Sequence, residues 1–303
     1  MAELRFDGRV AVITGAGRGL GAAYAKLLAA RGAKVVVNDP GVSMAGDGAD
    51  AGPAQLVVDE IKSAGGEAVA NTDSVATEEG GAAIVRSAVE HFGRVDILIH
   101  NAGIVRRSPL KEMSSDVFES VLDVHLRGGF HVVRAAFPMM CEAGYGRIVL
   151  TGSINGLYGN RDVANYSVAK AGLIGLSNVA AIEGEAFGVK SNVILPGAVT
   201  RMAEGLDTSK YPPMDPELVA PVVAWMAHES CSISGEMMIS IAGRIARAYA
   251  AETKGVYRPS WTLEQVAEQI EAIRDTRDSL VFPPVPTGHI DHLRYSFEMA
   301  SKG

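Results

Sequence analysis

A tyrosine and a lysine four residues apart, with a serine upstream, are the side chains of this sequence best suited to chemistry. Tyr166 and Lys170 stand in the run Asn-Tyr-Ser-Val-Ala-Lys, and Ser153 precedes the tyrosine by thirteen positions. If residues 164–187 form a helix, the tyrosine and the lysine share one face, one turn apart. An ammonium beside a phenol lowers the tyrosine pKa from its ordinary value of about 10. The pair is therefore predicted to move a proton to or from an alcohol; a chance pair on an exposed helix is the alternative.

A glycine-rich turn near the N-terminus favours the chemical interpretation. Residues 9–14 are an apolar run typical of a buried strand, and a helical pattern covers 22–31. The glycines between them let backbone N–H groups approach a pyrophosphate, which the helix N-terminus then stabilises. The spacing is G-x-x-x-G-x-G rather than G-x-G-x-x-G, and a simple tight turn is the alternative. Six residues are assigned to this cofactor loop: Gly15, Gly17, Arg18, Gly19, Leu20 and Gly21.

An aspartate about twenty residues beyond these glycines indicates which dinucleotide binds. Residues 34–38 read as a second strand, and Asp39 follows it directly. A carboxylate there accepts bonds from the adenine-ribose hydroxyls of NAD and repels the 2′-phosphate of NADP. Arg18 argues for NADP, because a cation in the glycine loop can pair with that phosphate. We weigh Asp39 more heavily and expect NAD; an aspartate that only starts a turn before Pro40 is the alternative.

Strand and helix patterns alternate along the rest of the chain. Strand patterns cover 67–71, 95–100, 146–152, 190–195 and 235–241, and helical patterns cover 53–64, 77–92, 114–141, 164–187 and 216–229. This order predicts an α/β fold of the Rossmann type, a doubly wound parallel sheet with helices on both faces. Ligands bind at the carboxyl ends of such strands. Those ends carry Asp73, Asn101, Ser153 and Pro196, so we expect one shared site.

The sequence divides after the last strand pattern. Residues 1–243 are the predicted NAD-binding and catalytic domain, and residues 244–303 are a C-terminal extension. In the extension, Thr262-Leu-Glu-Gln is a capping box that predicts a helix over 262–277. We expect the extension to pack on the same domain or on a dimer partner, as an appendage or as a wall of the substrate cavity. Residues 201–215, rich in Met and Pro, are predicted to form a substrate lid.

Composition narrows the class of protein. The net charge of −7 argues against nucleic acid and anionic membrane surfaces as partners. The two cysteines lack metal-ligand spacing, which fits a reducing compartment and gives no reason to expect a metal site. We find neither a signal peptide nor an apolar run of about eighteen residues, and therefore expect a cytoplasmic protein.

Taken together, these motifs resemble the short-chain dehydrogenase/reductase family over roughly residues 8–243. The resemblance implies that the serine and tyrosine hydroxyls hold the substrate oxygen, while hydride moves between the carbinol carbon and the nicotinamide. The lysine is implied to lower the tyrosine pKa and to bind the nicotinamide ribose. The implied catalytic residues are Ser153, Tyr166 and Lys170. Besides the glycine loop, the implied cofactor contacts are Asp39, Asp73, Ser74, Asn101, Ala102, Gly103, Tyr166, Lys170, Pro196, Gly197, Val199 and Thr200.

One position departs from the family pattern and points to a subgroup. The family often has an Asn in its long helix that supports a proton-relay water, and His125 stands there. We expect this histidine either to hold a water in catalysis or to be structural. Its surroundings resemble a subgroup that oxidises (3R)-hydroxyacyl-CoA to 3-ketoacyl-CoA with NAD. The segments that carry this likeness are Val124-His-Leu-Arg-Gly128, Val36-Val-Asn-Asp39, Arg147-Ile-Val149, Leu157-Tyr-Gly-Asn160, Ala181-Ile-Glu-Gly184 and Ala227-His-Glu-Ser-Cys231.

The resemblance implies an NAD-dependent oxidation of a secondary alcohol, with a fatty acyl or steroid side-chain 3-hydroxyacyl-CoA as substrate and a homodimer or higher homo-oligomer as assembly. An NADPH-dependent 3-ketoacyl reductase, a free hydroxysteroid dehydrogenase and a non-catalytic NAD-binding sensor stay open. A sensor has no need for the serine, the tyrosine and the lysine together. Three basic residues after the Asn101 loop either bind the acidic CoA or belong to a solvated loop: Arg106, Arg107 and Lys111.

Overall fold

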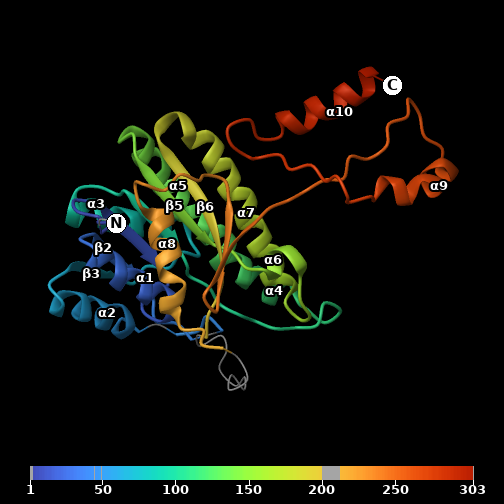
Figure 1. Ribbon diagram of the computed structural model, residues 1–303. Coiled ribbons are helices and arrows are strands. Elements are labelled where there is room, and N and C mark those ends of the chain that lie inside the picture. Colours follow the sequence, from blue (N-terminus) through green and yellow to red (C-terminus); the bar gives the residue numbers. More distant parts are fainter. Residues whose placement is uncertain (1–2, 44, 49, 200–211, 303) are drawn as a thin grey trace.

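A sheet of eight strands runs through the part of the chain described by this computed structural model, residues 3–43, 45–48, 50–199 and 212–302 (Figure 1). The strand order is β3-β2-β1-β4-β5-β6-β7-β8, and it reverses between β1 and β4. Such a reversal is where doubly wound folds bind ligands, so the predicted Rossmann-type fold is confirmed. The strands are β1 (Val10–Thr14), β2 (Lys34–Asn38), β3 (Glu67–Asn71), β4 (Ile97–His100), β5 (Gly146–Thr151), β6 (Val189–Gly197), β7 (Met237–Ile241) and β8 (Arg244–Ala248).

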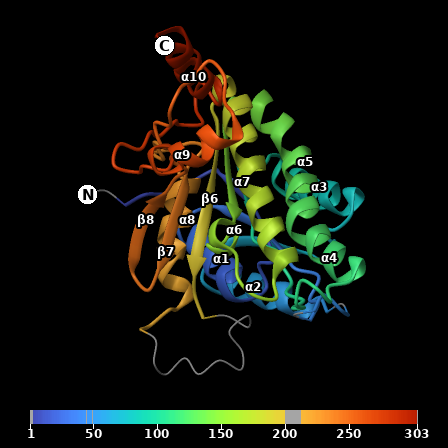
Figure 2. The same ribbon diagram turned by 90° about the vertical axis from the view of Figure 1, so that its right-hand side faces the viewer.

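Helices cover both faces of this sheet (Figures 1 and 2). On one face lie α1 (Gly19–Ala30), α2 (Gly52–Ser63) and α8 (Ala220–Ala227); on the other lie α3 (Glu78–Phe92), α5 (Gly128–Glu142) and α7 (Ala164–Gly184). Successive strand residues alternate between the two cores: Ala11 and Ile13 join the first, and Val10 and Val12 join the second. Strands buried on both faces read as continuous apolar runs, which is why their patterns were recognisable.

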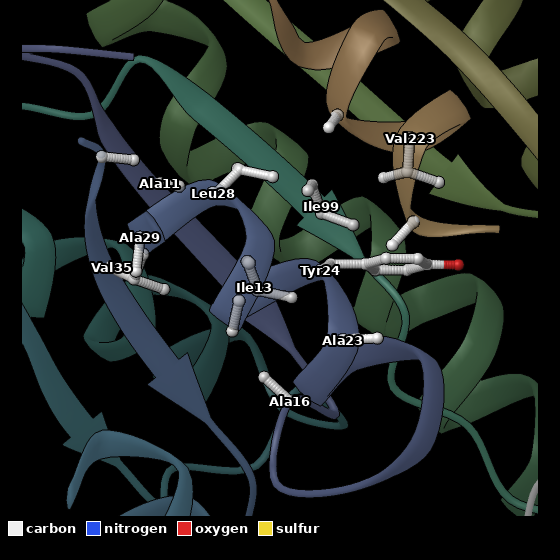
Figure 3. Close-up of a cluster of buried hydrophobic side chains, with 14 of the residues drawn as sticks. Ala11, Ile13, Ala16, Ala23, Tyr24, Leu28, Ala29, Val35, Ile99 and Val223 are labelled. Atoms are coloured by element: carbon white, nitrogen blue, oxygen red, sulfur yellow. The ribbon is translucent and has the colours of Figure 1, made fainter. Parts of the chain in front are cut away.

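The core under α1 and α8 is made mostly of small and branched side chains (Figure 3). Tyr24 is its largest member, and its fully buried ring extends from α1 towards Val223 of α8. The Tyr24 hydroxyl finds no hydrogen-bond partner among the described residues. Burying a hydroxyl without a partner costs free energy, so this position stabilises the core less than an apolar ring of the same shape would.

The predicted helix over 114–141 is interrupted. It consists of α4 (Ser115–Leu122), a π-helical turn η1 (Asp123–Arg127) and α5. Single π-turns inside helices frequently accompany functional sites, and this one carries His125. Three shorter elements are α6 (Asn155–Tyr158), η2 (Glu185–Phe187), which follows α7, and η5 (Pro216–Leu218), which precedes α8. None of the helices in the described ranges is long and apolar enough to span a membrane.

Strand β8 was not predicted. It pairs antiparallel with β7 through a turn at Ala242 and Gly243, whose φ values of 49° and 79° are both left-handed. Two left-handed residues between strands are the geometry of a tight hairpin, and the sequence Ala-Gly gave only a weak signal for it. The predicted domain boundary after residue 243 therefore falls inside a β-hairpin of the sheet. The position at which the domain ends stays a prediction.

The extension beyond β8 contains two helices, α9 (Leu263–Ile273) and α10 (Ile290–Lys302), which lie outside the main body in Figure 1. The predicted capping box is confirmed: the Gln265 N–H donates to the Thr262 hydroxyl over 3.3 Å, and the Thr262 N–H donates to the Gln265 side chain over 3.0 Å. Helix α9 is shorter than predicted, and α10 was not predicted. The segment between them returns to the body, where Gly288 approaches Ile182 of α7.

Candidate active site

A cavity of about 450 Å³ lies at the carboxyl ends of the strands, where the strand order reverses. Thirteen of the predicted catalytic and cofactor-binding residues line it: Gly15, Arg18, Gly19, Leu20, Asp39, Ser74, Asn101, Ala102, Gly103, His125, Tyr166, Lys170 and Pro196. Six others are close in sequence to this lining but outside it: Gly17, Gly21, Asp73, Ser153, Gly197 and Val199. Thr200 and residues 201–211 of the predicted lid lie outside the described residues. The structure thus gathers most of the predicted site, while the role of each residue stays a prediction.

The glycine loop is shaped so that side chains are excluded. Gly15 has a left-handed φ of 62°, and a Cβ on it would lie 2.7 Å from the Ala102 Cα. A Cβ on Gly21 would lie 2.2 Å from the Gly15 carbonyl oxygen. Helix α1 then begins at Gly19 without a side-chain cap from Arg18, which leaves its first N–H groups for another acceptor. This cradle fits the pyrophosphate of a dinucleotide.

Asp39 is held beside this loop. It is 7% exposed, and its carboxylate accepts hydrogen bonds from the Gly17 N–H at 3.0 Å and the Gly41 N–H at 2.8 Å. A Cβ on Gly17 would come within 2.8 Å of the carboxylate, so glycine is needed for this approach. The negative charge is therefore fixed at the end of β2, on the wall of the cavity, where it can accept further hydrogen bonds and repel a second anion.

A buried hydrogen-bond network positions the loop after β4. The Thr14 hydroxyl accepts from the N–H groups of Asn101 and Ala102, both at 3.1 Å, and is 3.0 Å from His100 Nδ1. His100 Nε2 lies 2.9 Å from the His125 carbonyl oxygen, so it donates there and Nδ1 accepts the Thr14 proton. Burial lowers the pKa of His100 to about 3, which keeps this tautomer neutral. The network joins β1, β4 and η1 at the floor of the site.

Tyr166 and Lys170 lie on one face of α7, as predicted, but their electrostatics differ from the prediction. The Lys170 ammonium nitrogen is 5.5 Å from the centre of the Tyr166 ring and donates a hydrogen bond to the Thr151 carbonyl. Burial lowers the pKa of Lys170 to about 7. Burial raises the pKa of Tyr166, and a hydrogen bond from Ser153 opposes the rise only in part. The expected lowering of the tyrosine pKa is therefore wrong for the protein alone, because desolvation outweighs the hydrogen bond from Ser153.

His125 is fully buried in the wall of the cavity. Its ring packs edge-on against Tyr166, with 5.2 Å between ring centres. His125 Nε2 lies 2.8 Å from the Ile104 carbonyl oxygen and also accepts from the Ile104 N–H over 3.1 Å, while Nδ1 has no partner among the residues that the structure describes. Burial holds the pKa of His125 well below its ordinary value, so the ring is neutral. The ring packs against Tyr166, and one of its nitrogens makes no hydrogen bond to the described residues. Its catalytic role stays a prediction.

Several residues of the cavity wall were not among the predicted site residues. Val42, Ser43 and Gly46 belong to the loop after Asp39, and Ile104 faces them from the loop after β4. Small and polar residues in a loop give no signal for burial against a ligand, so only the fold reveals them. Arg106, for which CoA binding and a solvated loop were both left open, lines the cavity and hydrogen-bonds to this loop.

Comparison with known proteins decides the family. A family model described as short chain dehydrogenase matches residues 9–210. The chain belongs to the short-chain dehydrogenase family. Its members are oxidoreductases that use a nicotinamide cofactor, so the predicted resemblance and the enzyme class are confirmed.

The relatives also bear out the predicted subgroup. The chain is 46% identical over 320 residues to peroxisomal multifunctional enzyme type 2 of Drosophila melanogaster, covering 99% of this chain and 53% of the relative. It is 44% identical to the peroxisomal hydratase-dehydrogenase-epimerase of Saccharomyces cerevisiae, covering 91% of this chain and 31% of that protein. The chain thus spans about half or less of the length of these curated relatives.

Solved structures give the same result. The full-length Drosophila multifunctional enzyme matches with a TM-score of 0.80 and 39% identity, over 99% of this chain and 50% of that one. A short chain dehydrogenase from Mycobacterium avium matches with a TM-score of 0.78 and 39% identity, over 93% of this chain and 98% of that one. The fold of the dehydrogenase region is therefore shared with both.

The expected cytoplasmic location is contradicted. The similar enzymes of fly, yeast and mouse are all named peroxisomal. Composition and cysteine content could not reveal this, because delivery to an organelle depends on short receptor-read signals rather than on the fold or its charge.

Proposed function

We propose that this dehydrogenase uses NAD to oxidise the 3-hydroxyl group of a 3-hydroxyacyl-CoA to a ketone. The observation that carries the proposal is that Tyr166, Lys170 and the glycine loop with Asp39 line one cavity. Proton-transfer chemistry and dinucleotide recognition are thereby combined in one space. The similarity to enzymes named multifunctional enzyme type 2 and hydratase-dehydrogenase-epimerase supports an acyl thioester as the substrate class.

In the proposed oxidation, Ser153, Tyr166 and Lys170 have different roles. The Ser153 hydroxyl and the Tyr166 hydroxyl orient the substrate alcohol, and Tyr166 takes its proton as general base. The Lys170 amine, with a pKa of about 7, is part protonated at neutral pH and favours the phenolate when it is charged. NAD held by the glycine loop and Asp39 would supply the acceptor for the hydride from the carbinol carbon. Lys170 is 3% exposed and Tyr166 is partly buried, so the proton moves in a site largely shielded from water.

Asp39 supports NAD rather than NADP. Its carboxylate is fixed by two backbone N–H groups at the end of β2, so it cannot swing away from an approaching phosphate. A second anion there would lie beside a buried negative charge in a low-dielectric setting. Arg18 also lines the cavity and favours the second candidate, an NADPH-dependent 3-ketoacyl reductase. Steady-state KM values for NAD and NADP separate the two.

The test of the proposal is a spectrophotometric assay of NAD reduction. The panel contains 3-hydroxyacyl-CoAs from short fatty acyl to steroid side chains, each as the 3R and the 3S epimer, with free hydroxysteroids as the matched comparison. We expect turnover of the thioesters with NAD. Preference for the free steroids, or reduction of 3-ketoacyl substrates with NADPH only, contradicts the proposal.

We also propose that the protein works as a homodimer or larger homo-oligomer. Large apolar side chains are exposed on α5 and α7, with Phe130 49%, Val168 47% and Val179 51% exposed. On α9 the spacing of Leu263, Val266 and Ile270 puts exposed side chains along one face. A second copy of the chain would remove these surfaces from water. Light scattering behind a sizing column measures the mass; a monomer at micromolar concentration contradicts the proposal.

A further inference from the structure

The loop that follows Asp39 forms one side of the cofactor cavity. Residues 42, 43 and 45–48, here called the roof segment, are held together by short-range hydrogen bonds. The Ser43 N–H donates to the Asp47 carbonyl over 2.8 Å, and the Gly46 N–H donates to the Ser43 carbonyl over 3.0 Å. At its base, the Asp50 N–H donates to the Pro40 carbonyl over 3.0 Å. The described residues of the segment are therefore bonded to one another, and Pro40 and Asp50 are bonded at its base.

Arg106 fastens this turn to the opposite wall. Its Nε donates to the Ala45 carbonyl over 2.7 Å, and its Nη2 lies 3.3 Å from an Asp47 carboxylate oxygen. The Asp47 side chain is 75% exposed, so water weakens the ion pair, and the bond to Ala45 is the stronger attachment. Next to this bond the roof segment approaches the loop after β4, because a Cβ on Gly46 would lie 3.1 Å from the Ile104 side chain.

The backbone of the same arginine is tied to the catalytic helix. The Asn165 side-chain amide donates to the Arg106 carbonyl over 3.0 Å and to the Val117 carbonyl over 3.2 Å. Asn165 is fully buried, and its side-chain oxygen accepts from the Tyr166 N–H at 2.8 Å. Arg106 thus joins the roof segment at one end and the start of α7 at the other.

We infer that Arg106 is a positioning residue that holds the roof segment closed over the bound dinucleotide and thereby slows its release. This inference rests on the proposed function, since it concerns the same cofactor. CoA binding by Arg106, one of the two roles left open from the sequence, stays a separate prediction; here the guanidinium contacts Ala45 and Asp47. Opening the roof segment must break the bond to Ala45, whereas the chemistry at Tyr166 does not involve the guanidinium.

The experiment compares wild type, Arg106→Gln and a matched control, Arg86→Gln, which removes an arginine 60% exposed on α3. Stopped-flow fluorescence measures NADH dissociation, calorimetry measures the Kd for NAD, and a single-turnover assay measures hydride transfer. We expect Arg106→Gln to raise the dissociation rate constant about tenfold, the factor that one charge-assisted hydrogen bond supplies. Its effect on hydride transfer at saturating NAD should be smaller, and Arg86→Gln should match wild type.

A second measurement does not depend on a variant folding well. Proteinase K cleavage within residues 40–52 of wild type should slow when NADH is added, because the roof segment is then held closed. Equal cleavage with and without NADH, or an unchanged NADH dissociation rate in a folded Arg106→Gln protein, overturns the inference. The inference is also overturned if Arg106→Gln and Arg107→Gln both raise the KM for the acyl-CoA while the Kd for NAD and the NADH dissociation rate stay unchanged. Failure of wild type to bind NAD in calorimetry overturns the proposed function, and the inference with it.

Discussion

Lys170 gives the most quantitative test of how the site is built. Its side chain is 3% exposed, and burial lowers its pKa from 10.5 to about 7. Between these two values the unfolded chain binds a proton that the folded chain does not, so the free energy of unfolding rises with pH across this window. Each pKa unit corresponds to about 1.36 kcal/mol, so the shift makes the folded protein about 5 kcal/mol less stable below pH 7 than above pH 10.5.

The perturbation is Lys170→Met, which keeps the length of the side chain and removes the titrating amine. Urea unfolding of both proteins without cofactor, from pH 7.5 to pH 9.5, gives the difference in free energy of unfolding. Subtraction cancels the contributions of other titrating groups, including Tyr166. Between pH 7.5 and pH 9.5, we expect the free energy of unfolding to rise by about 2.5 kcal/mol more in wild type than in the variant. As a control, Lys26→Met, which removes a lysine paired with Glu60 on the surface, should keep the pH dependence of wild type.

A flat difference between wild type and Lys170→Met over that range would refute the reasoning. It would mean that the Lys170 amine reaches water in the folded protein. The amine would then not be desolvated, despite its hydrogen bond to the Thr151 carbonyl. A gain of the opposite sign would mean that an anion holds the ammonium charged, which the described residues around it do not provide.

Three further predictions test other parts of the account. Asp39→Gly should raise the KM for NAD and allow turnover with NADP, because it removes the charge that repels a 2′-phosphate; an unchanged cofactor preference in steady-state kinetics contradicts this. Tyr24→Phe should raise the free energy of unfolding by about 1–2 kcal/mol in urea titrations, because it removes a buried hydroxyl with no partner among the described residues; a loss of stability contradicts it. Because burial keeps His125 neutral, the kcat profile around its ordinary pKa of 6.5 should be the same in wild type and His125→Asn. A step near that pH that disappears in the variant contradicts the assignment.

Local patterns were sufficient to predict the sheet and the cofactor loop. Strand β1, residues 10–14, is buried on both faces of a parallel sheet, so its apolar run was identified without reference to the rest of the fold. The glycines at 15–21 were recognisable because close backbone approach leaves no alternative residue. The i, i+4 spacing of Tyr166 and Lys170 likewise fixed their shared face on α7.

The features that could not be predicted depend on contacts between segments far apart in the sequence. The raised pKa of Tyr166 follows from the burial of its side chain, which the sequence around Tyr166 does not reveal. Strand β8 depends on a two-residue turn with a weak signal. The bond of Arg106 to the loop after β2 could not be predicted, because its partner Ala45 contributes only a backbone carbonyl and leaves no mark in the sequence.

The central claim, that Tyr166 transfers the proton in an NAD-dependent oxidation, is tested most directly by single-turnover hydride transfer in Tyr166→Phe. The substrate is the 3-hydroxyacyl-CoA that wild type oxidises fastest, and calorimetry on the same preparation measures NAD binding. The account predicts that the rate constant falls by a factor on the order of 100 to 10,000, the usual contribution of a general base, while the variant still binds NAD. Hydride transfer at close to the wild-type rate in a protein that binds NAD would contradict it.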